Sequence, residues 1–304
     1  MESSFIAWLR TVCPPHPALA VGPGDDAAVL SVAGGGQLVV TTDLLTEGVD
    51  FLLAEHDPRR IGHKALAANL SDLAAMAARP LAVVIALALP EQGADSLARD
   101  LYGGILPLAA RFGVAIAGGD TNTWAGGLAI SITAIGTPTA RGPLLRSGAR
   151  PGDRILVTGS LGGSILGRHF DFEPRLAEAL LLADRYQLHA GIDVSDGLSL
   201  DLSRLASESG CGAKIDFSQI PVSDAAVQLA AQGDDGQTAL DHALADGEDF
   251  ELVLAVPPGE AERILRDQPL DIPITAIGEF ITEPGLWESS AAGTRPLAPR
   301  GYEH

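Results

Sequence analysis

The sequence predicts a two-domain protein of the α/β or α+β class, and three observations support this prediction. The chain has 304 residues, which is long for one small hydrophobic core and suits two domains. Strand-like and helix-like segments alternate in both halves of the chain. Between the halves, residues 137–153 are rich in proline, glycine and arginine, as linkers often are. We therefore expect the domains to cover residues 1–140 and 141–304.

Hydrophobic periodicity predicts two helices in the first half of the chain. Leu66, Leu70 and Leu73 recur at helical spacing in the first of them. Pro80 is expected to end that helix, because the residue before a proline disfavours helical backbone angles. We expect these helices over residues 59–78 and 94–112. Short apolar or β-branched runs predict strands over residues 37–43, 81–89, 114–117 and 128–136.

The second half begins again with a strand and continues the alternation. Residues 191–210 predict a strand, a polar turn and a helix, in that order. Leu198, Leu202 and Leu205 form the buried stripe of this helix. We expect another helix over residues 174–184, and strands over residues 154–159, 250–256 and 273–280.

Composition and charge exclude several classes of protein. The formal net charge is -19 and the isoelectric point is near 4.6, which argues against binding to nucleic acids or anionic membranes, since both are polyanions. The most apolar run, residues 81–89, is too short for a membrane helix, and the N-terminal segment does not resemble a signal peptide. Cys13 and Cys211 give no disulfide framework. We therefore expect a cytoplasmic protein.

Several aspartates lie at the ends of apolar segments, where α/β proteins commonly place ligands. A solvated turn or a helix cap would explain any one of them. If all converge, cations must offset their mutual repulsion, and oxygen ligands without histidine or cysteine favour Mg²⁺ over Zn²⁺. Because Mg²⁺ often binds carboxylates together with phosphates, the pattern points to phosphate chemistry. These aspartates are Asp26, Asp43, Asp72, Asp120, Asp193 and Asp196.

Other features fit a phosphate-bearing substrate. Glycines in residues 117–122 could bring backbone N–H groups close to an anion. A helix starting near Gly197 would point its N-terminus at a phosphate, and Arg146 could bind one through its planar guanidinium. The chain lacks the P-loop lysine motif, the protein-kinase signatures, zinc-binding spacings and the serine-hydrolase elbow. The sequence therefore argues against those enzyme classes.

A series of motifs resembles the thiamine-monophosphate kinase family, within the aminoimidazole ribonucleotide synthetase and selenophosphate synthetase superfamily. In chain order they are GPGDDAAVL, VVTTDLLTEGVDF, KALAANLSDLAAMAARP, GVAIAGGDTN, LRSGARPGDRILVTGSLG, GIDVSDGLSLDL and ADGEDFEL, and the resemblance continues to the C-terminal GYEH. The resemblance implies direct transfer of the ATP γ-phosphate to thiamine monophosphate, with several Mg²⁺ ions and without a phosphoenzyme. It also implies an N-terminal α+β domain whose sheet forms a homodimer, followed by a C-terminal α/β domain.

The same resemblance implies roles for individual residues. Metal ligands would be Asp26, Thr41, Thr42, Asp43, Asp72, Asp120, Asp193 and Asp196, among which Asp43, Asp120 and Asp196 would be catalytic. The nucleotide would contact Tyr102, Gly119, Asp120, Arg146 and Ser195. Thiamine monophosphate would contact Asp50, Glu248 and Tyr302. Two of these depart from the family pattern, since Asp50 replaces a common histidine and Tyr302 replaces a common tryptophan. A tyrosine ring can still stack on the cationic thiazolium.

Two expectations concern the surroundings of the site. Asp25 is expected to shape the turn beside the metal ligand Asp26. The apolar segment 81–89, paired with residues 128–135, is expected to bury one sheet face against a second copy of the chain.

Two alternatives remain open from the sequence. One is another ATP-using enzyme of the superfamily, although Cys13 lacks the basic, glycine-rich setting that selenophosphate synthetase would need, and the chain does not end in the cysteine expected of a hydrogenase-maturation dehydratase. The other is a noncatalytic acidic protein that binds divalent metals. Metal-dependent turnover of ATP with thiamine monophosphate distinguishes all three.

Overall fold

The computed structural model describes residues 2–233, 236–290 and 293–302. The helices are α1 (Glu2–Val12), α2 (Pro58–Ala75), α3 (Ala94–Phe112), α4 (Arg168–Asp171), α5 (Leu176–Arg185), α6 (Leu198–Glu208), α7 (Asp224–Gln232), α8 (Ala239–Ala245) and α9 (Pro258–Asp267), with 3₁₀ turns η1 (Ser164–Leu166) and η2 (Phe217–Gln219). The strands are β1 (Leu19–Val21), β2 (Ala28–Val32), β3 (Gly36–Thr46), β4 (Ala78–Pro90), β5 (Ala115–Trp124), β6 (Ala129–Pro138), β7 (Arg154–Thr158), β8 (Ala190–Asp193), β9 (Gly212–Asp216), β10 (Leu252–Val256), β11 (Ile274–Ile281), β12 (Gly285–Ser290) and β13 (Gly293–Leu297).

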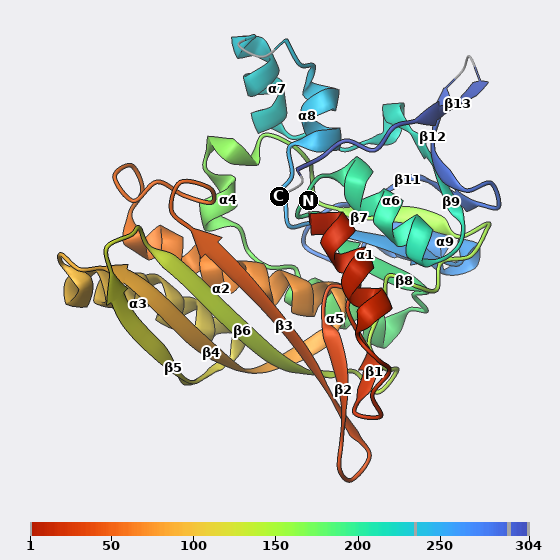
Figure 1. The fold of residues 1–304 in the computed structure, drawn as a ribbon. Helices are drawn as coiled ribbons and strands as arrows, with labels where there is room; N and C mark the ends of the chain where they lie inside the picture. The colour runs from red at the N-terminus through yellow and green to blue at the C-terminus, as the bar shows by residue number, and fades with distance from the viewer. Residues whose placement is uncertain (1, 234–235, 291–292, 303–304) are drawn as a thin grey trace.

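Two mixed sheets organise the chain (Figure 1). The first has the strand order β1-β2-β3-β6-β4-β5, in which β4 and β5 run parallel. The second has the strand order β13-β12-β9-β11-β7-β10-β8, in which β9 and β12 run parallel. The first sheet comes from the first half of the sequence and the second sheet from the second half, with helices in both. The expectation of a two-domain protein of mixed α and β structure is therefore confirmed.

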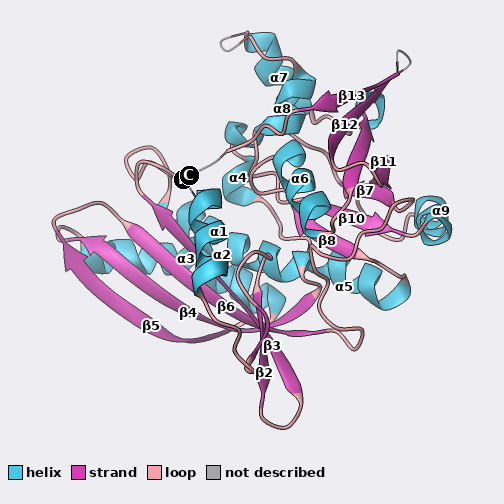
Figure 2. Ribbon diagram, turned by 45° about the vertical axis from the view of Figure 1, so that its right-hand side comes forward, coloured by secondary structure: helices cyan, strands magenta, loops and turns pink. Residues whose placement is uncertain are grey.

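Helix α2 joins the two domains (Figure 2). Asp57 caps its N-terminus and Pro58 stands in its first turn, where a missing N–H group costs no helical hydrogen bond. The predicted stripe of Leu66, Leu70 and Leu73 is fully buried. With α3, this helix covers one face of the first sheet, while α4, α5 and β8 of the second domain pack against it. Polar residues of α2 therefore reach the boundary between the domains.

The second sheet is covered on both faces, so β10 is buried along its whole length. Leu252 and Leu254 pack into the core that includes α2, and Val253 packs into the core that includes α6 and α8. Strands β8 and β10 are antiparallel neighbours in which Asp193 pairs with Leu252. The turn that follows β8 and the loop that precedes β10 therefore emerge side by side.

Helix α2 ends three residues earlier than expected, and Pro80 does not end it. Met76 is its C-cap, and Ala77 takes a left-handed backbone with a φ of 47°. The chain then enters β4 at Ala78, which places Pro80 inside a strand. The pairing of β4 with β6 shifts register between Pro80 and Ala82, and such an irregularity accommodates a residue without an N–H group.

The strand expected over residues 114–117 does not end at the following glycines. Strand β5 continues through Gly118 and Gly119 to Trp124. A Cβ atom on Gly119 would lie 1.8 Å from the carbonyl oxygen of Ile85 on β4, so the close approach of these strands requires glycine. A register shift between Val83 and Val84 marks a bulge beside it. Gly119 thus serves strand packing, and both glycines lie in a strand where a turn was expected.

The helix predicted over residues 94–112 is confirmed. Gly113 ends it with a left-handed backbone, which glycine adopts without steric cost. Helices α1, α4, α7, α8 and α9 were not predicted. No helix within the described ranges is both long and apolar enough to cross a membrane.

Candidate active site

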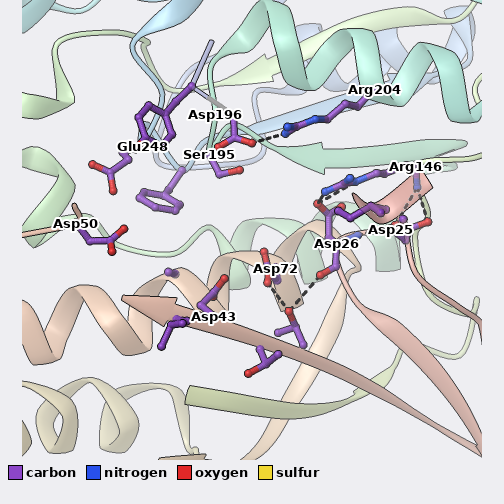
Figure 3. A pocket seen from close by; sticks show the side chains of 18 of the residues that line it. Asp25, Asp26, Asp43, Asp50, Asp72, Arg146, Ser195, Asp196, Arg204 and Glu248 are labelled. Carbon is purple, nitrogen blue, oxygen red and sulfur yellow. Dashed lines mark hydrogen bonds and ion pairs between the residues drawn. The ribbon is translucent and has the colours of Figure 1, made fainter. Parts of the chain in front are cut away.

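A cavity of 670 Å³ lies between the two domains and is the candidate active site (Figure 3). This volume is usual for a small-molecule site. The first domain lines the cavity with the glycine turn at residues 24–26, the end of β3 and part of α2. The second domain lines it with the turn at residues 195–196, α6 and the loop before β10. Helix α1 and Tyr302, from the two ends of the described chain, also line it.

Three aspartates from different elements meet at the domain boundary. Asp26 follows the glycine turn, Asp72 projects from α2 and Asp193 ends β8. One carboxylate oxygen of each lies within 4.8 Å of the other two. The Thr41 hydroxyl donates to Asp72 at 2.5 Å, and the Ser71 hydroxyl donates to Asp193 at 2.5 Å. These neutral donors orient two of the carboxylates without cancelling their charge.

Burial and mutual repulsion make this acidic cluster costly without a cation. Burial, followed by neighbouring negative charges, raises the pKa of Asp72 and Asp193 well above the ordinary aspartate value. Burial, followed by repulsion from Asp50, raises the pKa of Asp43 to about 6. Among the described side chains, the buried Oδ2 atoms of Asp26 and Asp43 have no hydrogen-bond partner. Such buried carboxylate oxygens fit a hard divalent cation such as Mg²⁺.

Two arginines partly neutralise the cavity. Arg146 donates to Asp26 Oδ1 from Nε at 3.1 Å and from Nη2 at 2.5 Å. The backbone N–H of Arg146 donates to the carboxylate of Asp25, whose pKa burial raises to about 6. Arg204 on α6 pairs with Asp196. The adjacent carboxylates of the glycine turn therefore differ in position, because Asp26 faces the acidic cluster whereas Asp25 holds the backbone of Arg146.

At the N-terminus of α6, two backbone N–H groups that were expected to face a phosphate are already bonded to a carboxylate. Asp201 Oδ2 accepts hydrogen bonds from the backbone N–H groups of Asp196 and Gly197 at 2.9 and 3.1 Å. A carboxylate at this position already uses these donors and repels another anion. Arg146 and Arg204 are therefore the better candidates for binding phosphate oxygens.

The other end of the cavity is lined by Asp50 and Glu248 (Figure 3). Glu248 has a left-handed backbone with a φ of 52°, which is strained for a residue with a side chain. Its carboxylate lies 2.5 Å from the ammonium of the buried Lys64. Burial opposes ionisation of Glu248, but a hydrogen bond from His169 and the charge of Lys64 outweigh it and lower the pKa of Glu248.

Tyr302, the last described residue, joins the same cavity. Its backbone N–H donates to the carbonyl oxygen of Asp196 at 2.9 Å, and half of its side chain is exposed. Nearby, Ser199 and Arg300 exchange two hydrogen bonds that tie the C-terminal segment to α6. Residues 303–304, which complete the GYEH motif, lie outside the described residues.

Three residues of the expected site lie away from this cavity within the chain. They are Tyr102 on α3, and Gly119 and Asp120 on β5. Asp120 pairs with Ala86 on the neighbouring strand, and both side chains lie on the open face of the first sheet. The strand registers place Asp43 on the opposite face, which the helices cover. Three strand spacings, or about 14 Å, separate β3 from β5. Asp43 and Asp120 of one chain therefore cannot bind the same metal ion.

The two expected threonine ligands also point in different directions, as successive strand residues do. Thr41 contacts the acidic cluster, whereas the Thr42 hydroxyl lies 3.1 Å from that of Thr133 on the open face of the sheet. Ser195 lines the cavity, and its carbonyl oxygen accepts from the N–H of Glu248 at 2.7 Å.

Sequence reasoning missed Lys64, His169 and Arg204. Lys64 stands three positions after Ile61, on the buried face of α2. A single charged residue on an apolar helix face was therefore the signal that could have indicated Lys64. Arg204 stands one turn after Asp201 and pairs with it. His169 had no local signal, because only tertiary packing brings α4 to Lys64.

Comparison with known proteins identifies the family. The model for the N-terminal domain of AIR synthase related proteins matches residues 24–137, and the model for their C-terminal domain matches residues 150–286. A thiamine-monophosphate kinase of Rhodopirellula baltica is 45% identical to this chain, over 100% of this chain and 97% of its own length. The chain belongs to the thiamine-monophosphate kinase family. The family member from Escherichia coli K12 is 34% identical over 93% of this chain and 91% of its own length.

Solved structures of the family share the fold. AaThiL complexed with AMPPCP and TMP matches with a TM-score of 0.85 and 26% identity, over 100% of this chain and 96% of that chain. The thiamine-monophosphate kinase from Stenotrophomonas maltophilia K279a matches with a TM-score of 0.74 and 34% identity, over 94% of each chain. The hydrogenase maturation protein HypE of E. coli, at 23% identity and a TM-score of 0.73 over 99% of each chain, shares the fold alone. Function must therefore be argued from the site.

Proposed function

We propose that this chain transfers the γ-phosphoryl group of ATP to thiamine monophosphate, giving ADP and thiamine diphosphate. One observation carries the proposal: a single cavity joins an acidic cluster, suited to metal-bound phosphates, to an end lined by Asp50, Glu248 and Tyr302. Those three residues suit a substrate that is both aromatic and cationic. The solved family member that matches the whole of this chain carries AMPPCP and TMP together.

We assign several Mg²⁺ ions to the acidic part of the cavity. The orphaned carboxylate oxygens and the all-oxygen donor set support this assignment. The side chains that would hold the ions within one chain are Asp26, Thr41, Asp43, Asp72, Asp193 and Asp196, whereas the Thr42 hydroxyl lies on the open face of the sheet and is not assigned to them. When bound, the ions would neutralise phosphate charge and align the reacting oxygens.

The residues of the chain supply binding and orientation. The bond that forms joins a phosphate oxygen of thiamine monophosphate to the γ-phosphorus, and the bond that breaks leaves its electron pair on the β-phosphate oxygen of ADP. The attacking oxygen is already ionised at neutral pH, so no carboxylate is needed as a strong general base. Arg146 would bind phosphate oxygens through its guanidinium, and Ser195 would contact the nucleotide. Glu248 and Tyr302 would hold the thiamine moiety.

We also propose a homodimer that forms through the open face of the first sheet. Leu44 and Val84 expose 63% and 40% of their surface there, and a second copy packed on residues 81–89 and 128–135 would cover them. A partner chain would also be needed for the nucleotide and metal roles of Tyr102, Gly119 and Asp120. Residues 1–140 would then form the nucleotide, metal and dimerisation domain, and residues 141–304 the second domain. The cytoplasmic location stays a prediction.

An assay of the purified protein with ATP, thiamine monophosphate and Mg²⁺ tests the proposed function. We expect thiamine diphosphate and ADP in equal amounts, and none without a divalent ion. A noncatalytic metal-binding protein would bind Mg²⁺ without releasing ADP. Another enzyme of the superfamily would leave thiamine monophosphate unchanged. Either result with saturating substrates would contradict the proposal.

A further inference from the structure

A buried lysine lies beside the end of the cavity assigned to thiamine monophosphate. Lys64 is 2% exposed, and an ammonium so deeply buried requires close partners. Its Nζ lies 2.5 Å from Glu248 Oε1 and donates to the carbonyl oxygen of Asp50 at 3.0 Å. One buried charge therefore contacts both acidic residues proposed to bind the substrate. Glu248 and Asp50 come from different domains, so this contact also spans the domain boundary.

Helix α4 supplies the remaining neighbours of the lysine. His169 Nδ1 lies 3.1 Å from Lys64 Nζ and 3.0 Å from Glu248 Oε2. The ring centroid of Phe170 is 5.2 Å from Nζ, a distance at which a ring face attracts a cation. Both carboxylate oxygens of Glu248 are thus held, one by Lys64 and the other by His169.

Glu248 requires this support because its backbone is strained. Glu248 and Phe250 both have left-handed backbones, with φ values of 52° and 50°. Such strained conformations persist only where several surrounding contacts hold them in place, and they are common at binding sites. The Glu248 side chain is still 35% exposed, and it lines the cavity. It is therefore fixed in orientation while remaining accessible to a ligand.

We propose that Lys64 is a positioning residue that holds the Glu248 carboxylate in the arrangement that binds the cationic thiamine moiety. This inference rests on the proposed function. A carboxylate that is already oriented loses little conformational freedom when it binds a cation, so its affinity is higher. Lys64 is 2% exposed, although it borders the cavity, and we assign its effect to Glu248, whose carboxylate is the accessible group.

The chain offers a matched control, because Lys214 is its one other lysine. Lys214 also pairs with a glutamate, Glu279, at 2.6 Å, on strands β9 and β11 and away from the cavity. Lys64→Met and Lys214→Met remove the same charge while keeping a side chain of similar length. We expect Lys64→Met to raise both the Kd and the KM for thiamine monophosphate about 10-fold, with the KM for ATP changed less than about twofold. Lys214→Met should leave all three unchanged.

Glu248→Gln separates positioning from a general effect on folding. If Lys64 acts through Glu248, adding Lys64→Met to Glu248→Gln should weaken binding of thiamine monophosphate by less than about twofold. A further tenfold loss would overturn the inference, and so would equal losses for ATP and thiamine monophosphate. Lys64→Gln supplies the same comparison should the methionine variant fail to fold. Binding by isothermal titration calorimetry is measured well below the melting temperature of each variant.

The same experiment keeps the two proposals apart. A wild-type protein that neither binds nor phosphorylates thiamine monophosphate would overturn the proposed function, and the substrate role of Lys64 with it. A wild-type protein that does both, alongside a folded Lys64→Met variant of equal affinity, would overturn the inference alone.

Discussion

The two ends of the cavity treat their carboxylates differently. At one end, Asp72 and Asp193 approach Asp26 within 4.8 Å, and burial followed by repulsion raises the pKa of both. At the other end, Glu248 is partly buried, yet His169 and Lys64 outweigh the effect of that burial and lower the pKa of Glu248. On the proposed function the first end would need ions from solution, whereas the fold supplies the second end with its own cation. Substitutions should therefore affect the two ends in different ways.

The largest expected effect is at the acidic end. Asp43→Asn or Asp120→Asn should lower turnover by at least about 100-fold, because each would remove charge that holds a metal ion at the transferring phosphate. Asp43→Asn should not lower the melting temperature, since it relieves repulsion in the metal-free protein. Asp95→Asn, which alters an exposed ion pair on α3, serves as the control. Near wild-type rates in saturating Mg²⁺ would contradict the assigned ligand.

The second prediction tests whether the acidic end is completed by another chain. Asp43 and Asp120 lie on opposite faces of the sheet within one chain. Mixing equal amounts of unfolded Asp43→Asn and Asp120→Asn chains and refolding them together should restore about a quarter of wild-type activity, because half the dimers are mixed and one of their two sites is intact. No recovery, or a monomer near 31 kDa by light scattering, would contradict the shared site.

A smaller effect is expected at the substrate end, where the chain supplies its own countercharge. Tyr302→Ala should raise the KM for thiamine monophosphate several-fold to about 30-fold, since stacking on a cation is worth about 0.5–2 kcal/mol. The KM for ATP should barely change, and Tyr302→Trp should be tolerated. Steady-state kinetics that vary each substrate in turn provide the measurement. Equal losses for both substrates would indicate a folding defect, and no loss would remove Tyr302 from the site.

The smallest effect concerns stability without metal. The folded-state pKa of Asp43 is about 6, raised by burial from 3.8, so the folded protein binds more protons than the unfolded chain across that window. Protonation of Asp43 stabilises the folded protein, and this stabilisation is complete at low pH. It is lost as the pH rises from about 4 through about 6. Between pH 5 and pH 8, the melting temperature of the metal-free protein should fall more than that of Asp43→Asn, by roughly 2–5 °C. Mg²⁺ at pH 8 should reduce this difference, and identical pH profiles would contradict it.

Local signals predicted the helix over residues 94–112 well, because its apolar spacing and the left-handed stop at Gly113 involve neighbouring residues. Local signals failed at Pro80, which was expected to end a helix but lies inside β4, because pairing with β6 determines the strand there. They failed again at Gly119, because the carbonyl group that requires a glycine there belongs to Ile85 on another strand. In each failure, the deciding partner lies outside the segment that was interpreted.

The sequence by itself determined the family, the two-domain mixed architecture and the residue types of the site. These depend on motifs and periodicities that extend over a few residues. The tertiary structure alone decided which of those residues meet. Ser71 reaches Asp193 across 122 positions, and Lys64 reaches His169 across 105. Burial and neighbouring charge determine the pKa and the partners of each group, and both arise only when distant segments pack together.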